Sequence, residues 1–264
     1  LGHTLIDRSA RRARLTPAGE EAARSAQAIL DESANLLARV QDMDEPLAGK
    51  LKLGIIPTIA PYILPGILPD LHDSYPDMQL QLYEDLTDRL LKQLREGNLD
   101  LALLALPCDT SGMHERTLFD ESFVLAGLPD QLPVPDNLTL ADIDREAILL
   151  LEDGHCLRDH ALAACDLKPP QEVPTFSATS LPTLLRMVEH GYGLTLLPEM
   201  AATADTLPGH VAIRNFAAPA PSRRIGLLWR THNPRAGAFE QLAQSIETIY
   251  TQGAQNAETA HIAS

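Results

Sequence analysis

Strand-like and helix-like segments alternate between residues 50 and 106, and this alternation restricts the fold more than any other feature of the chain. The segments predicted as strands are 50–56, 78–85 and 99–106, and those predicted as helices are 61–76 and 87–98. The third strand, LDLALLAL, is a continuous apolar run, which is typical of a strand buried on both faces. The order β-α-β-α-β therefore predicts an α/β fold with a parallel sheet.

A second series of elements follows and indicates a second lobe. The predicted strands are 122–128, 147–153, 173–178, 194–198, 210–216 and 223–230, and the predicted helices are 156–166, 180–190 and 235–250. The last strand and helix share the apolar pattern of the first series. We therefore expect two α/β lobes with crossing strands between them, and a C-terminal helix that returns to the first lobe. This arrangement leaves a ligand-sized cleft at the lobe junction.

A long helix is predicted before the first lobe. Thr16 is a suitable N-cap, and Pro17 suits the first helical position. The apolar residues recur along one face, at Ala26, Leu30, Leu37 and Val40. A single apolar stripe on a long helix favours pairing with another helix, such as one from a second chain, over packing on its own domain. Pro46 and Gly49 then indicate a linker over residues 44–50.

Charge and cysteine content argue against several classes of protein. The formal net charge is −15 over 264 residues, which argues against the whole chain lying on nucleic acid or anionic lipid. No stretch resembles a signal peptide or approaches the ~20 apolar residues of a membrane-spanning helix, so no membrane partner is expected. Three cysteines argue against a secreted disulfide framework and favour a reducing cytoplasm.

The first sixteen residues differ in charge from the rest of the chain. Four arginines and Asp7 give them a local charge of +3, which is four minus one. These arginines are Arg8, Arg11, Arg12 and Arg14. The stretch is either a solvated basic arm or the end of a truncated DNA-binding unit, since clustered arginines suit phosphate contacts.

Two of the three cysteines lie in one segment, LLLEDGHCLRDHALAAC. His155, Cys156, His160 and Cys165 supply two imidazoles and two thiols, but adjacent His and Cys side chains point apart, and zinc sites favour C-x2–4-C or H-x3–5-H pairs. We therefore expect no metal. A Cys–His hydrolase is also disfavoured, because nothing nearby supplies an oxyanion hole or a third group in a recognisable order.

A redox role for Cys156 has a physical basis. The start of a helix favours a thiolate, and His155 and Arg158 could add positive charge, so the sequence predicts a lowered pKa and oxidation to a sulfenic acid. Cys165 could then form a disulfide with it. Nine residues of α-helix span roughly 13–14 Å, whereas a disulfide requires Cα atoms about 4.4–6.8 Å apart, so the segment would have to change shape. The alternative is that both cysteines are small buried hydrophobes.

Four other residues have both a structural and a functional interpretation, and Cys108 has a structural one alone. Thr58 follows the first strand, where it is either a plain turn hydroxyl or a group facing the cleft. Thr87 suits an N-cap at a strand-to-helix turn, a position that also borders ligand space. Arg223 and Arg224 are either solvated strand ends or a source of charge in the cleft. Cys108 ends an apolar strand and is predicted to be a core or rim residue.

Three stretches of the sequence resemble the LysR-type transcriptional regulators. LGHTLIDRSARRARLTPAGE is similar to the wing and linker-helix start of their DNA-binding domain, and GIIPTIAPYILP to the first strand and helix of their effector domain. LLLEDGHCLRDHALAAC, with both cysteines and their spacing, resembles the peroxide-sensing segment of the OxyR subfamily. The first stretch is specific only to LysR-type regulators, while the last is specific to the subfamily. The resemblance covers about residues 1–250.

The resemblance implies a periplasmic-binding-protein-like effector domain of two α/β lobes, preceded by a long linker helix and a remnant of a winged helix-turn-helix domain. The implied divisions are 1–16 for the remnant, 17–45 for the linker and dimerisation helix, 50–126 with 227–252 for lobe I, 127–226 for lobe II, and 253–264 for a disordered tail. The helix-turn-helix would precede residue 1, so the chain as given is expected to bind its operator poorly.

The resemblance also implies a redox-sensing transcription factor rather than an enzyme. Cys156 would be the peroxidatic cysteine and Cys165 its resolving partner. The residues implied to line the peroxide pocket are Thr58, Thr87, His155 and Arg223, with Asp159 helping to hold the sensing loop. No cofactor is implied, because hydrogen peroxide is the signal. The implied partners are further copies of the chain in a homodimer or homotetramer, promoter DNA and RNA polymerase, and oxidation would alter transcription of peroxide-defence genes.

Three other functions are weighed against this one. The first is a LysR-type regulator switched by a small metabolite in the interlobe cleft. The second is the solute-binding protein of a transporter, which the missing signal peptide and the basic N-terminal stretch disfavour. The third is an enzyme that uses Cys156.

Overall fold

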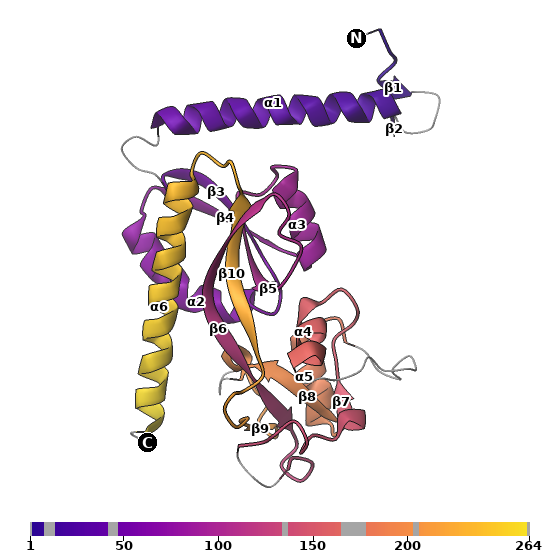
Figure 1. The fold of residues 1–264 in the computed structure, drawn as a ribbon, viewed down its shortest axis with the longest axis vertical. Coiled ribbons are helices and arrows are strands. Elements are labelled where there is room, and N and C mark those ends of the chain that lie inside the picture. Colours follow the sequence, from indigo (N-terminus) through magenta and orange to yellow (C-terminus); the bar gives the residue numbers. More distant parts are fainter. Residues whose placement is uncertain are drawn as a thin grey trace.

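The computed structural model describes residues 2–7, 14–41, 47–133, 137–164, 178–202 and 206–262. The chain forms two α/β lobes, and a long N-terminal helix stands apart from both of them (Figure 1). The expected arrangement of two lobes with crossing strands is therefore observed.

The first lobe is built on three parallel strands. These are β3 (Gly49–Ile55), β4 (Met78–Glu84) and β5 (Leu101–Leu106), connected by α2 (Ala60–Ser74) and α3 (Thr87–Arg95). β3 pairs in parallel with both β4 and β5, and every residue of β5 is buried, as its apolar run predicts. Because the three strands point the same way, the turns that follow β3 and β4 lie at one edge of the sheet.

Two long antiparallel strands complete this sheet and connect it to the second lobe. β10 (Ser222–Arg230) pairs with β5 and with residues 113–122 of β6 (Met113–Gly127). The end of β6 then pairs with β8 (Leu194–Pro198) and β9 (Ala212–Arg214), and β8 pairs with β7 (Ile148–Leu149). β6 is thus shared by both lobes.

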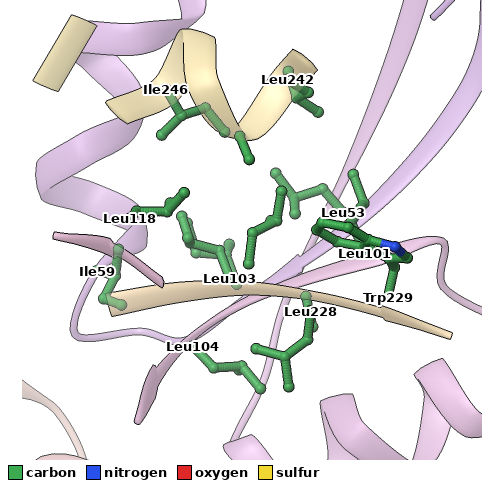
Figure 2. Close-up of a cluster of buried hydrophobic side chains, with 14 of the residues drawn as sticks. Leu53, Ile59, Leu101, Leu103, Leu104, Leu118, Leu228, Trp229, Leu242 and Ile246 are labelled. Carbon is green, nitrogen blue, oxygen red and sulfur yellow. The ribbon is translucent and has the colours of Figure 1, made fainter. Parts of the chain in front are cut away.

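Each lobe has its own hydrophobic core. In the first lobe, α6 (Ala236–Ile262) packs on the sheet, and Figure 2 shows Leu242 and Ile246 of this helix facing Leu103. The C-terminal helix therefore returns to the first lobe. In the second lobe, α5 (Leu181–Glu189) packs on β8, and Phe123 of β6 joins their core.

Three elements differ most from the prediction, and β9 is also shorter than the predicted strand 210–216. β6 begins at Met113 rather than at residue 122. The prediction missed its first half, MHERTLFD, because this stretch is polar and only partly buried. β7 is shorter than the predicted 147–153 and is followed only by an isolated bridge between Leu151 and Ala178. α6 continues to Ile262, so the predicted disorder is wrong for residues 253–262, where alanine, glutamine and glutamate favour a helix. Apart from Ala178, the predicted strand 173–178 lies outside the described residues.

The N-terminal segment forms a small hairpin and the predicted long helix. β1 (Ile6–Asp7) pairs with β2 (Arg14–Leu15), and α1 extends over Pro17–Gln41. Thr16 caps this helix, since its Oγ1 accepts a hydrogen bond from the Gly19 backbone N–H at 3.0 Å. Arg8, Arg11 and Arg12 lie outside the described residues, as do the side chains of Leu37 and Val40.

The exposed face of α1 bears on its predicted pairing. Ile29 and Leu30 are 70% and 63% exposed, which leaves apolar surface free along the helix. Pairing of this surface with a second helix stays a prediction. In the described segments, no helix combines the length and apolar character that a bilayer crossing requires.

Candidate functional site

Cys156 is the first residue of α4 (Cys156–Ala164), as predicted, and it lies where the two lobes meet. Leu157 and Ala161 anchor α4 in hydrophobic clusters of the second lobe, whereas Cys156 packs against the core of the first. His160, one turn further along, places its Nε2 3.3 Å from the backbone carbonyl of Pro107 in the first lobe. Cys156 is a free, partly buried thiol. It therefore faces the first lobe from a helix that belongs to the second.

Three segments surround the thiol: the turn after β3, the start of α3 and the turn before α4. They contribute Ile56, Pro57, Thr58, Leu86, Thr87, Gly154 and His155. The space that these residues enclose with Cys156 is too narrow for a water molecule. Thr58, Thr87 and His155 are all buried. The structure thus brings these three predicted residues to Cys156 in one narrow pocket.

Arg223 is held in a buried ion pair at the end of β10. Its Nε donates to Oε2 of Glu121 at 2.7 Å, and both side chains are fully buried. Its Nη1 and Nη2 donate to Oγ1 and to the backbone carbonyl of Thr58, each at 3.0 Å. The guanidinium charge lowers the pKa of Cys156. Arg223 therefore contacts the pocket through Thr58, whereas its neighbour Arg224 is exposed.

Thr87 is not the N-cap of α3. Leu86 occupies that position, and Thr87 is the first helical residue. Among the described residues, Oγ1 of Thr87 is buried without a hydrogen-bond partner of regular geometry. The same hydroxyl interacts with the Cys156 thiol and favours its thiolate form, so the two groups are close. Thr87 therefore has hydrogen-bonding capacity directed toward the pocket rather than toward the helix.

The prediction that the pKa of Cys156 is lowered is wrong. Burial raises the pKa of the thiol from its ordinary value of 9.0, and the opposing effects of Thr87 and Arg223 are smaller. Arg158 forms an ion pair with Asp153 at 3.1 Å and donates to the Leu151 carbonyl. The thiol is thus mostly protonated at neutral pH.

The raised pKa predicts slow alkylation of Cys156. At about pH 7, iodoacetamide should modify it more slowly than it modifies free cysteine, because only the thiolate is nucleophilic. The rate should still be rising at pH 9.0, the ordinary pKa of a thiol. Peptide mass spectrometry of protein quenched at successive times measures this rate. A rate that reaches its plateau below about pH 8 would contradict the raised pKa.

Two other candidate residues, Asp159 and Cys108, do not line the pocket of Cys156. Asp159 lies on α4 with an exposed side chain, and its charge raises the pKa of Cys156. Cys165 lies outside the described residues. Cys108 is partly buried against the core of the first lobe, as predicted, and burial is the main cause that raises its pKa to about 11.

The sequence gives no signal for Glu121. The residue stands in a stretch of mixed polarity, HERTLFDESF, where a glutamate is most simply a solvated side chain. Its burial arises only because β6 crosses from one lobe to the other beside Arg223 of β10. Only a buried Arg223 would imply a buried carboxylate partner, because an unpaired charge in the interior is costly.

Comparison with known proteins shows what the chain resembles. Residues 44–249 match the LysR substrate binding domain. The chain is 42% identical over 253 residues to a probable hydrogen peroxide-inducible genes activator of Streptomyces viridosporus, a match that covers 93% of this chain and 80% of that protein. It is 39% identical over 248 residues to the DNA-binding transcriptional dual regulator OxyR of Escherichia coli (strain K12), covering 93% and 81% of the two chains.

A solved structure extends the comparison to three dimensions. A cysteine-to-serine variant of OxyR from Corynebacterium glutamicum with bound hydrogen peroxide matches with a TM-score of 0.76 and 35% identity. The match covers 98% of this chain and 84% of that one. Together with the family match, it confirms the periplasmic-binding-protein-like fold.

Proposed function

This chain belongs to the family of LysR-type transcriptional regulators, and from its similarity to peroxide-inducible gene activators we propose that it responds to hydrogen peroxide. The relatives described above are peroxide-inducible gene activators and OxyR proteins, which are regulators and not enzymes. The observation that carries the proposal is the placement of Cys156 as a free thiol in a narrow pocket with Thr58 and Thr87, where Arg223 donates to Thr58.

In the proposed reaction, the Cys156 thiolate attacks one oxygen of hydrogen peroxide. A sulfur–oxygen bond forms, the oxygen–oxygen bond breaks, and the second oxygen leaves as hydroxide and takes a proton to become water. The sulfur supplies two electrons and becomes a sulfenic acid. Since the resting thiol has a raised pKa, its thiolate fraction does not account for a selective reaction of Cys156 with hydrogen peroxide. The Arg223 charge and the Thr58 hydroxyl can instead stabilise the negative charge that develops on the leaving oxygen.

Cys165 is the proposed resolving residue. Its thiolate attacks the sulfenic sulfur of Cys156, a disulfide forms, and hydroxide leaves and is protonated to water. The eight helical steps of α4 separate the Cα atoms of Cys156 and Ala164 by about 12 Å. The one further peptide unit to residue 165 can shorten that separation by no more than its own span of about 3.8 Å. Because a disulfide requires Cα atoms no more than about 6.8 Å apart, this bond can form only if α4 unwinds.

Unwinding of α4 would break the packing of Leu157 and Ala161 in the second lobe and the contact between His160 and Pro107. This rearrangement is the proposed signal. It would change a homodimer or homotetramer joined through α1, and thereby its action on promoter DNA and RNA polymerase at peroxide-defence genes. The protein is proposed to act in the reducing cytoplasm, where Cys156 returns to a thiol, and to need no cofactor.

The dimensions of the pocket favour this function over a metabolite switch. The space at Cys156 does not admit even a water molecule, so a small oxidant needs less displacement of its walls than a metabolite does.

Thiol counting tests the proposal. One equivalent of hydrogen peroxide should remove two of the three thiols, and peptide mapping should recover Cys156 linked to Cys165. A protein that retains all three thiols after this treatment is not a thiol-based peroxide sensor.

A further inference from the structure

Glu121 is a fully buried carboxylate that the proposed reaction does not use. It lies on β6, in the part that pairs with β10, two residues before the strand begins to pair with β8 in the second lobe. Its Oε2 accepts from Arg223, and its Oε1 accepts from the Met200 backbone N–H at 3.1 Å. Both carboxylate oxygens are therefore fixed by donors, one from a side chain and one from the backbone.

This anchoring determines how Arg223 meets the pocket. With Nε held by Glu121, the planar guanidinium can turn only one edge, carrying Nη1 and Nη2, toward Thr58. The Thr58 hydroxyl accepts from Nη1, so its own hydrogen must point away from the guanidinium. Thr58 also lines the pocket of Cys156, where that hydrogen is available to an oxygen-containing ligand.

We propose that Glu121 is a positioning residue for the reaction of Cys156 with peroxide. By fixing Arg223, it directs the donors of Arg223 and Thr58 toward the oxygen that leaves. This role rests on the proposed function, because it concerns the same reaction. Glu121 acts only through Arg223 and Thr58 and does not touch the pocket itself.

Glu121→Gln separates this role from a purely structural ion pair. The second-order rate constant of Cys156 with hydrogen peroxide should fall about 10- to 100-fold, because misplaced donors stabilise the transition state less. Alkylation by iodoacetamide should not fall, because it needs only the thiolate, and the charge of Arg223 is no longer balanced by a carboxylate. The matched control is Asp120→Asn, the same charge change at the exposed neighbouring residue, which should leave both rates unchanged.

Glu121→Asp covers the case in which the glutamine variant does not fold. It keeps the ion pair but withdraws the carboxylate by about one C–C bond, roughly 1.5 Å. Its peroxide rate should also fall, while its alkylation rate stays near that of the wild type. In a Thr58→Val background, either change at Glu121 should have a smaller effect on the peroxide rate than in the wild type. The reason is that the Thr58 hydroxyl, through which Glu121 acts in part, is already missing.

Wild-type peroxide rates in both Glu121 variants, or equal losses in peroxide and alkylation rates, would overturn the positioning role and leave the peroxide sensor intact. A wild-type protein whose Cys156 is inert to peroxide would overturn the proposed function and the role of Glu121 together. The two failures are therefore distinguishable in one set of measurements.

Discussion

Cys156→Ser is expected to abolish oxidation by stoichiometric peroxide. Serine has nearly the same size as cysteine, so the packing of α4 against the first lobe should survive, but a hydroxyl is not oxidised to a sulfenic acid. With no sulfenic acid at residue 156, no disulfide to Cys165 can form. The variant should retain both of its remaining thiols after one equivalent of peroxide, as measured by thiol titration and peptide mapping.

Cys108→Ser is the matched control for this variant. Cys108 is the other described cysteine, it packs on the same core, and its thiol has a pKa of about 11. This variant should still lose two thiols at the wild-type rate. If Cys108→Ser loses the response while Cys156→Ser keeps it, the reactive thiol has been assigned to the wrong residue.

Arg223→Met is expected to lower the free energy of unfolding by about 3–5 kcal/mol at about pH 7, since it leaves Glu121 charged and unpaired in the interior. The loss should depend on pH. Burial raises the pKa of Glu121 from its ordinary value of 4.5, and Arg223 opposes that shift, so removing Arg223 raises the pKa further. A carboxyl group whose pKa is higher in the folded than in the unfolded state destabilises the folded protein at high pH. This cost disappears at a pH low enough to protonate the group in both states.

The difference in unfolding free energy between Arg223→Met and the wild type should therefore shrink as the pH falls toward 4.5. Urea denaturation at several pH values measures it. Arg224→Met, at the exposed neighbouring position, should change stability by less than about 0.5 kcal/mol at any of these pH values. A loss for Arg223→Met that stays constant from neutral to acidic pH would show that Glu121 is not the source of the cost.

Local patterns predicted most of the first lobe because its strands and helices have distinct periods. The run at 99–106 can be read as a buried strand without any tertiary information, and β5 is that strand. The first half of β6 could not be predicted in this way, because MHERTLFD forms a strand only when β10 pairs with it. That pairing joins residues about a hundred positions apart, as Arg223 and Glu121 illustrate.

The candidate site shows the same division. The resemblance to LysR-type regulators named Thr58, Thr87, His155 and Arg223, and the structure gathers them around Cys156. The wrong direction for the pKa of Cys156 has a physical cause. A helix start and nearby basic residues can be read from the sequence, whereas burial at the lobe junction depends on how α4 packs on the first lobe.

Dimedone labelling of the Cys165→Ser variant tests most directly whether Cys156 is the peroxide-sensing thiol. Without the proposed resolving thiol, the sulfenic acid should persist and react with dimedone. After one equivalent of hydrogen peroxide, the account predicts a single adduct, on the peptide that contains Cys156, and an unmodified Cys108. An unlabelled Cys156, with the adduct on Cys108 or with no adduct at all, would contradict it.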